Sequence, residues 1–174
     1  MSSLLDLKNI IMRAPLQVIV FPFIKEGEGY LYAIFKRKDM DVWQAIAGGA
    51  EDEENPLEAA KREANEEAAI DPNFSYFRLS AIATIPAVNI GGLKWGTEII
   101  MIPEIAFGVE MVNKEFQISH EHTEFGWFSY EEAKEKLRYD SNKSALWELD
   151  YRLKNGLAGV EGNIENIKKF YSSI

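Results

Sequence analysis

The order of apolar and polar positions along the chain predicts a succession of strands and helices. Apolar, β-branched runs cover residues 16–23 and 30–35, and a glycine-containing turn at 26–29 separates them. Two such runs joined by a short turn are typical of a β-hairpin. The same kind of pattern predicts a strand at 74–85, with further strands at 97–102, 105–110 and 115–119. Residues 89–95 contain a Gly-Gly pair and are expected to form a loop, which could either cover a substrate or simply connect two strands.

A helix is predicted between the hairpin and these later strands. Asn55 is a favourable N-cap, Pro56 suits the first helical position, and Glu58 stands where a capping-box carboxylate would reach back. The helix should run from position 56 to about position 69. Its apolar stripe consists of four residues: Leu57, Ala60, Ala64 and Ala68.

Helical patterns return near the end of the chain. Ser129 caps one predicted helix, with Glu132 at the capping-box position. Residues 140–142 open a longer helix over 143–155, and 163–171 has the pattern of one more short helix. Strands, a central helix, more strands and then helices suit an α/β/α sandwich around a mixed sheet. We expect one domain over residues 1–174.

Three carboxylates lie on one face of the central helix. Glu63, Glu66 and Glu67 have the spacing i, i+3, i+4. Acidic residues on helices usually form a solvated face. Here, however, a helical wheel places Glu67 beside the alanine-rich stripe, and alanines allow a helix to lie close to a sheet. Because such carboxylates repel one another unless a cation lies between them, the pattern indicates a Mg²⁺ or Mn²⁺ site.

Composition narrows the partners. The chain has 28 acidic and 19 basic residues and a net charge of −9, which argues against a nucleic-acid polymer. It has no cysteine, which excludes disulfides, thiolate nucleophiles and zinc–thiolate sites. The first 14 residues are expected to be a lead-in and lack the pattern of a signal peptide, and no run reaches transmembrane length. A cytoplasmic location without a membrane partner is the expectation.

Residues around the acidic stretch suggest further contacts. Lys36 and Arg37 end a predicted strand, where they could contact phosphates or simply be solvated. Trp43 is expected in the core, although it could also support a flat ring. Glu54 is expected to brace the loop or pair with Arg62. The helical wheel places Arg62 away from the three carboxylates, which indicates a structural role.

The stretch from Gly48 to Ile70 resembles the Nudix box, G-x5-E-x7-R-E-U-x-E-E-x-G-U, where U is aliphatic. The matching positions are Gly48, Glu54, Arg62, Glu63, Glu66, Glu67 and Ile70. Ala64 is small for its aliphatic position. Ala69 replaces a glycine and should leave the helix end less sharply turned. The resemblance implies the Nudix fold and a metal bound by Glu63, Glu66, Glu67 and the Gly48 carbonyl.

Nudix enzymes commonly take one more carboxylate, as base or metal ligand, from a segment well beyond the box. The resemblance therefore points to Glu121, with Glu124 as the alternative. His120 and His122 flank Glu121 and are typical of a polar loop rather than a metal site. Strand alternation would place both histidines on the same face.

Shorter motifs are similar to those of bacterial dihydroneopterin-triphosphate pyrophosphatases. They are Trp43-Gln44, Glu121-His122 with Trp127, and Ser141-Asn142. This similarity implies that Trp43, Gln44, Ser141 and Asn142 contact the substrate.

The function that follows is Mg²⁺-dependent hydrolysis of a diphosphate linkage in dihydroneopterin triphosphate or a (deoxy)nucleoside triphosphate such as dATP. Glu66, Glu67 or Glu121 would accept the proton from water. A flat ring could lie on Trp43 or Trp95. The alternative is a Nudix-fold sensor that binds a nucleotide without cleaving it. The sequence leaves the substrate and the oligomeric state open.

Overall fold

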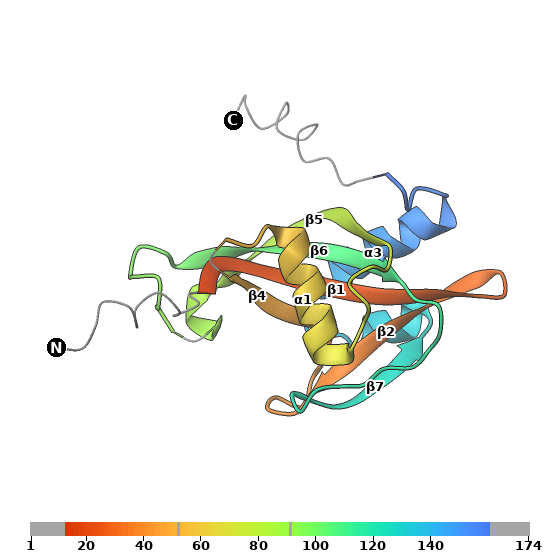
Figure 1. Cartoon of the computed structure of the whole chain (residues 1–174), viewed down its shortest axis with the longest axis horizontal. Coiled ribbons are helices and arrows are strands. Elements are labelled where there is room, and N and C mark those ends of the chain that lie inside the picture. Colours follow the sequence, from red (N-terminus) through yellow and green to blue (C-terminus); the bar gives the residue numbers. More distant parts are fainter. Residues whose placement is uncertain (1–12, 52, 91, 161–174) are drawn as a thin grey trace.

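A computed structural model describes residues 13–51, 53–90 and 92–160 (Figure 1). Residues 1–12 of the predicted lead-in and the predicted short helix at 163–171 lie outside the described residues. Residues 13 and 14 belong to the first strand, so the expectation that the lead-in extends to residue 14 is wrong for these two residues. Within the described residues, seven strands form one sheet. No helix of the described residues is both long enough and apolar enough to cross a membrane.

The sheet is built around β1 (Arg13–Glu26), its central strand. Along one edge β1 pairs antiparallel with β2 (Gly29–Arg37) and with β4 (Ile46–Glu51). On its other edge it pairs parallel with β6 (Met101–Glu110), which pairs antiparallel with β5 (Tyr76–Pro86). Strands β3 (Trp43–Gln44) and β7 (His122–Phe128) both pair with β2. The predicted hairpin and mixed sheet are confirmed.

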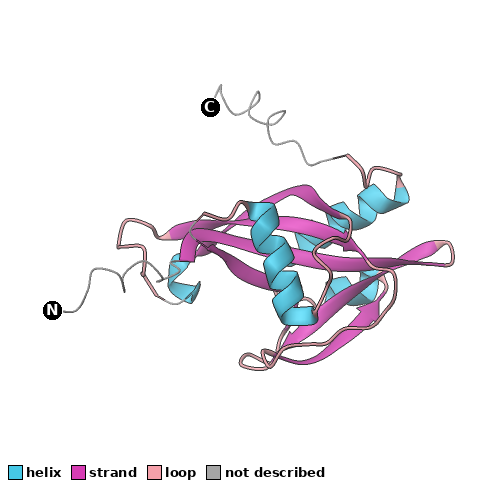
Figure 2. Ribbon diagram, in the orientation of Figure 1, coloured by secondary structure: helices cyan, strands magenta, loops and turns pink. Residues whose placement is uncertain are grey.

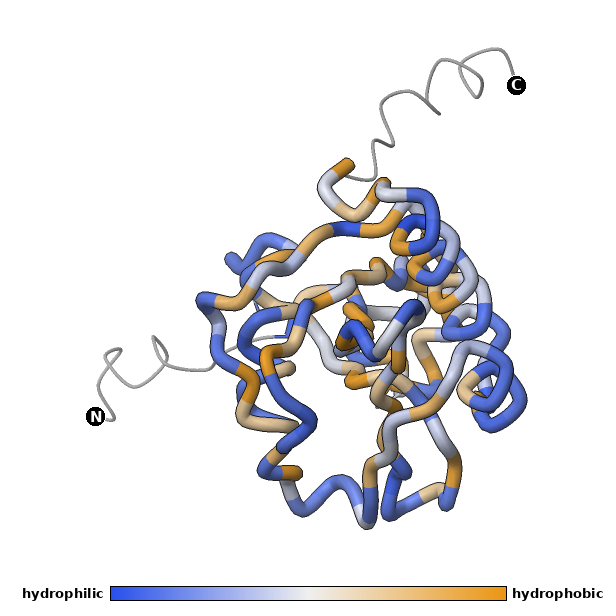
Figure 3. Tube along the Cα trace, turned by 90° about the vertical axis from the view of Figure 1, so that its right-hand side faces the viewer, coloured by the Kyte–Doolittle hydropathy of each residue, from blue (hydrophilic) through white to orange (hydrophobic). Residues whose placement is uncertain are grey.

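Helices cover both faces of the sheet (Figure 2). Helix α1 (Pro56–Ala68) lies on one face, here called the α1 face, and α2 (Tyr130–Lys136) and α3 (Asp140–Lys154) lie on the other, the α3 face. Side chains of a strand point alternately to the two faces. On β1, Val18 and Val20 join the core under α1, whereas Ile19 and Phe21 join the core under α3. This alternation of apolar side chains between the two faces produces the predicted α/β/α sandwich. Figure 3 shows how hydrophobic (orange) and hydrophilic (blue) residues are distributed along the chain.

Helix α1 begins as the sequence predicts. The Asn55 side chain accepts hydrogen bonds from the backbone amides of Leu57 and Glu58, and the Glu58 carboxylate accepts one from the Asn55 amide. Leu57 does not belong to the buried stripe, because it lies in the first turn, ahead of the positions that meet the sheet, and is 39% exposed. The buried residues are Ala59, Ala60, Ala64, Glu67 and Ala68.

The end of α1 differs from the expectation at Ala69. This residue adopts a left-handed conformation with φ of 53°, and its backbone amide donates to the Asn65 carbonyl. The helix therefore turns as sharply as it would with glycine, even though the side chain makes this conformation less favourable. Tertiary packing of the following residue, Ile70, which is 1% exposed, accompanies the turn.

Three other sequence predictions change in the structure. One strand, β6, replaces the two predicted around Pro103, because Pro103 precedes the segment of β6 that pairs with β1 and there pairs only with β5. Residues 97–100 are not a strand, and the 3₁₀ helix η2 (Ala87–Ile90) overlaps the start of the loop predicted at 89–95. Residues 115–119 are irregular. Their Ser119 amide donates to the Glu67 carbonyl on α1 rather than to a neighbouring strand.

Candidate functional site

Arg62 organises the carboxylates of α1 and the preceding loop. Its guanidinium donates two hydrogen bonds to Glu54, at 2.7 and 2.9 Å, and one to the Gly49 carbonyl at 2.8 Å. It also donates to Glu63 at 2.9 Å and to Glu66 at 3.2 Å. Hydrogen bonding to Glu54 raises the pKa of Arg62, and the same pair lowers the pKa of Glu54. The predicted Glu54–Arg62 pair is confirmed, but the expectation that Arg62 lies away from the three carboxylates is wrong, because its long side chain reaches two of them.

Gly48 lies directly against Glu63. A Cβ atom at position 48 would stand 1.9 Å from the Glu63 Cδ atom, so only glycine leaves room for this carboxylate. Burial raises the pKa of Glu63 to about 7; Arg62 opposes the rise, and the charges of Glu67 and Glu66 add to it. Glu63 is therefore a desolvated carboxylate that lies beside the backbone of Gly48 and has acidic neighbours.

Glu67 is buried and paired with a histidine. Its Oε2 atom lies 2.7 Å from His122 Nε2, and the two residues are 4% and 5% exposed. Burial raises the pKa of Glu67, and His122 opposes this rise. The expectation that both histidines belong to a polar loop is wrong for His122, which opens β7 and packs against Phe35 with ring centroids 5.3 Å apart. His120 is exposed, so the two histidines do not share an environment.

Glu121 is exposed, and its charge acts on both Glu67 and Arg37, raising the pKa of each. Arg37 is held by Asp39 through two hydrogen bonds of 2.9 and 2.6 Å. Glu124, the alternative distal carboxylate, instead forms an ion pair of 3.3 Å with Lys36. The structure therefore places Glu121, rather than Glu124, in the electric field of the box.

Lys36 forms ion pairs with more carboxylates than Arg37 does. In addition to Glu124, Lys36 pairs with Asp41 at 2.9 Å. The two carboxylates exceed the single ammonium charge of Lys36 locally. Arg37, in contrast, is within the field of Glu67 and Glu121 beyond its own partner Asp39.

Arg13 is a cation that the sequence reasoning left in the lead-in. It begins β1, and its Nε atom is buried without a hydrogen-bond partner among the described residues. A Cβ atom at Gly49 would lie 1.9 Å from that Nε, so the guanidinium lies directly against the box loop. Burial lowers the pKa of Arg13, and the charge of Glu63 opposes this effect. An arginine just before an apolar strand was the available signal, but only the sheet brings it to the box.

The four residues singled out by the shorter motifs are partly structural. Trp43 packs edge-on against Phe128, with ring centroids 5.5 Å apart, as expected of a residue at the margin of the core. Asn142 is 3% exposed, and its Oδ1 atom accepts a hydrogen bond of 2.9 Å from the Ala45 amide. Gln44 is buried as well, whereas Ser141, beside Asn142 at the start of α3, is partly accessible. Trp95 donates to the Arg13 carbonyl at 2.6 Å and so fastens the loop before β6.

The raised pKa of Glu63 predicts a pH dependence of stability in the metal-free protein. The folded-state value of about 7 lies above the ordinary value of 4.5, so the folded protein binds more protons between these limits. This stabilising contribution is complete below pH 4.5 and is lost as the pH rises through 7. We expect the free energy of unfolding to fall by about 1–2 kcal/mol over this range, after allowance for water that screens the group.

Urea unfolding of the metal-free protein at several pH values measures this change. Glu63→Gln removes the titrating group and should flatten that part of the profile. An unchanged profile in the variant would show that other groups cause the slope.

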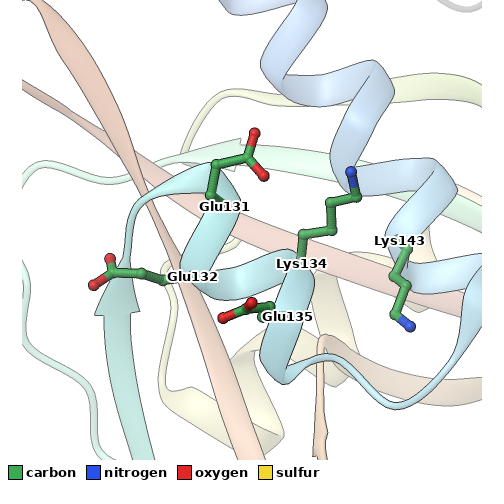
Figure 4. Close-up of a pocket in the computed structure, with 5 residues that line it drawn as sticks. All are labelled: Glu131, Glu132, Lys134, Glu135 and Lys143. Atoms are coloured by element: carbon green, nitrogen blue, oxygen red, sulfur yellow. The ribbon is translucent and has the colours of Figure 1, made fainter.

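A surface hollow of about 500 Å³ lies over α2 and the start of α3 (Figure 4). It is lined by Glu131, Glu132, Lys134, Glu135 and Lys143. In Figure 4 the side chain of Glu132 points to the left and that of Lys143 points downward, so these charged groups do not converge on one ligand. The acidic cluster on α1 is the better candidate for chemistry.

The donor set on α1 fits a divalent cation. Within residues 13–51, 53–90 and 92–160, no three histidine, aspartate or glutamate side chains form a ready metal-binding group. Arg62 contacts Glu63, and His122 contacts Glu67. The available atoms are nevertheless carboxylate oxygens and backbone carbonyls, which Mg²⁺ and Mn²⁺ prefer. The acidic neighbours that raise the pKa of Glu63 are the electrostatic reason for a cation to bind there.

Comparisons with known proteins agree with this fold and site. The NUDIX domain family model matches residues 15–147. A crystal structure of a proposed NUDIX hydrolase from Listeria monocytogenes is 41% identical, with 83% of this chain and 97% of that chain covered and a TM-score of 0.75. The chain therefore belongs to the NUDIX family and is a Nudix hydrolase. No curated protein matches the chain.

Two more distant structures show the shared fold. The E. coli dihydroneopterin triphosphate pyrophosphohydrolase is 18% identical, with a TM-score of 0.69 and coverage of 82% of this chain and 99% of that one. The NUDIX domain of Shewanella oneidensis NrtR, in complex with ADP ribose, is 13% identical, with a TM-score of 0.61 and coverage of 88% and 99%. Nudix hydrolases generally use divalent metal ions, so the family agrees with the acidic site.

Proposed function

We propose that this Nudix hydrolase cleaves a diphosphate linkage in dihydroneopterin triphosphate or a (deoxy)nucleoside triphosphate, and that it depends on Mg²⁺, with Mn²⁺ as a substitute. The observation that supports the proposal most directly is that Glu67 is buried and Glu63 partly buried on one face of α1, where desolvation raises the pKa of both. Removing carboxylates from water costs free energy, and carboxylates with raised pKa values cluster at functional sites.

The metal ligands in this proposal are Glu63, Glu66, Glu67, Glu121 and the Gly48 carbonyl. Bound Mg²⁺ would neutralise phosphate charge and lower the pKa of a water molecule. His122 orients Glu67 through their 2.7 Å contact, and Gly48 leaves room for Glu63. Arg62 keeps the box loop against the helix through Glu54 and the Gly49 carbonyl.

Proton acceptance is assigned to Glu121, with Glu66 and Glu67 as the other candidates. Glu121 is exposed and lies in the field of Glu67, so its carboxylate can approach water at the box while remaining solvated. The attacking water oxygen forms a bond to phosphorus, the bridging P–O bond breaks, and the leaving group is pyrophosphate or a monophosphate-bearing product, depending on the phosphorus attacked.

Phosphate binding is assigned to Arg37 and Arg13, with Lys36 in a lesser role. Arg37 lies in the field of Glu67 and Glu121, and the Arg13 guanidinium lies against Gly49 of the box. Trp43, Gln44, Ser141 and Asn142 complete the proposed substrate contacts. The net charge of −9 argues against a nucleic-acid polymer as partner. The proposal includes one domain over residues 1–174 and a cytoplasmic location.

A product-release screen tests this function. Purified protein is incubated with dihydroneopterin triphosphate, the four deoxynucleoside triphosphates, nucleotide sugars and ADP ribose, and phosphate products are measured with Mg²⁺, with Mn²⁺ and with EDTA. We expect release from at least one triphosphate that requires Mg²⁺ and stops in EDTA. No product from any of these compounds at any metal concentration would overturn the proposal.

The alternative is a sensor that binds a nucleotide without cleaving it. One observation favours it: Arg62 and His122 already engage the carboxylates that would hold a metal. The similar NrtR domain shows that this fold accommodates ADP ribose. Calorimetry with the same compounds, followed by product analysis, separates the two functions, because a sensor binds tightly and returns the compound intact.

A further inference from the structure

A small cavity lies on the α3 face, between the sheet and the first turns of α3. It encloses about 60 Å³, and its walls come from β1, β5, β6 and α3. Glu104 on β6 lines it and is only 6% exposed. Its Oε1 atom is buried and has no hydrogen-bond partner among the described residues. A buried carboxylate oxygen without a partner costs free energy, so a group that donates hydrogen bonds would be favoured in this cavity.

Other groups around Glu104 make the cavity partly polar. Ser141 and Ser144 line its α3 side, and Ala81 and Ala83 line its β5 side. Burial raises the pKa of Glu104, and an interaction with the Ser141 side chain opposes this rise. The small alanines leave a narrow space that would admit the edge of a flat ring.

A row of polar groups connects this cavity to the Nudix box. Glu104 pairs with Gln17 across β6 and β1, and Gln17 pairs with Gly49 across β1 and β4. Arg13 donates to the Gln17 side chain and lies against Gly49, whose carbonyl binds Arg62. Two strand spacings separate Glu104 from Gly49, which is roughly 10 Å. That is comparable to the separation between the ring and the phosphates of a nucleotide.

We propose that this cavity binds the ring edge of the substrate and that Glu104 selects rings in which a ring N–H stands beside an exocyclic amine on one edge. Guanine, a 2-amino-6-oxopurine, and pterins, which are 2-amino-4-oxopteridines, share this edge. The inference rests on the proposed function, because it specifies the ring of the same triphosphate substrate. An ionised carboxylate is an acceptor only, so it matches two adjacent donors. Adenine presents one donor beside an acceptor and is disfavoured.

Glu104→Gln tests this selection, since the amide replaces one acceptor oxygen by a donor while preserving side-chain size. Binding of dGTP, dihydroneopterin triphosphate and dATP is measured by calorimetry in Glu67→Gln protein, with and without the second substitution. We expect the preference for the first two over dATP to fall by about 10- to 100-fold in the double variant. Glu110→Gln, at the exposed end of the same strand, is the matched control and should leave the preference unchanged.

The outcomes distinguish this inference from the proposed function. If intact protein cleaves no triphosphate but Glu104→Gln still alters the binding preference, the proposed function fails and the inference stands. If the substitution leaves the preference unchanged, weakens all three ligands equally, or no ligand shows ring-dependent binding, the inference is overturned. The last two results would mean that the cavity holds only water or supports folding.

A second variant guards against misfolding of Glu104→Gln. Ala83→Val narrows the cavity from β5, where a β-branched residue suits the strand, and leaves Glu104 in place. We expect it to weaken dGTP binding about tenfold while tripolyphosphate, which lacks a ring, binds as before. Equal loss for both probes, or no loss for dGTP, contradicts the assignment of the cavity to the ring.

Discussion

Glu67→Gln should reduce Mg²⁺-dependent hydrolysis by about 10²–10⁴-fold while the protein remains folded. The amide keeps the size of the side chain and can still hydrogen-bond His122, but it loses the negative charge needed for a metal ligand or proton acceptor. Of Glu63, Glu66 and Glu67, only Glu67 is buried, at 4% exposed. The measurement is kcat/KM for the best triphosphate of the screen at saturating Mg²⁺.

A matched substitution controls for the loss of one negative charge. Glu135→Gln removes an exposed carboxylate from α2 and should leave kcat/KM within about twofold of the original value. Thermal unfolding of both variants shows whether the fold is retained. Full activity in folded Glu67→Gln would remove this residue from the mechanism.

Gly48→Ala should lower hydrolysis roughly 100-fold, because the new methyl group would occupy the place of the Glu63 carboxylate. The ideal Cβ would lie 1.9, 2.2 and 2.3 Å from the three terminal atoms of that side chain. Glu63 is flexible at its end and can move away, so we expect a small effect on stability, within about 1 kcal/mol. The carboxylate would then be absent from its position beside the box loop.

Gly29→Ala is the control for adding a methyl group to a strand of the same sheet. The nearest atom to its ideal Cβ is the Glu26 carbonyl oxygen at 4.0 Å, an ordinary contact. This variant should retain activity. If Gly48→Ala keeps the original activity and its apparent Mg²⁺ affinity, then the position of Glu63 does not matter for catalysis.

Local signals in the sequence predicted the helix that carries the site. The N-cap at Asn55, the proline at position 56 and the carboxylate of Glu58 all act through neighbouring backbone groups, so the start of α1 was predictable. Helical periodicity also predicted that Glu67 faces the protein interior, which the structure confirms. The end of α1 was less predictable, since packing around Ile70 holds Ala69 in a conformation that its own preference disfavours.

Local sequence patterns did not predict the contacts of side chains that reach across the structure. The wheel placed Arg62 away from the carboxylates because a wheel describes Cα directions and not the reach of a long guanidinium. His122 was assigned to a polar loop because nothing local shows that β7 brings it against Glu67, 55 residues earlier. Glu104 lies between two strands predicted from the sequence, and only the tertiary structure places it in β6 beside α3.

By itself, the sequence determined the start of the central helix, the family pattern of the box and the spacing of its three carboxylates. These properties depend on residues within one or two helical turns of one another. Only the tertiary structure decided which carboxylates are desolvated, which cations face them, and that Glu104, Gln17 and Gly49 form one row across the sheet. The physical reason is that burial and strand register depend on residues far apart in the chain, which local patterns do not encode.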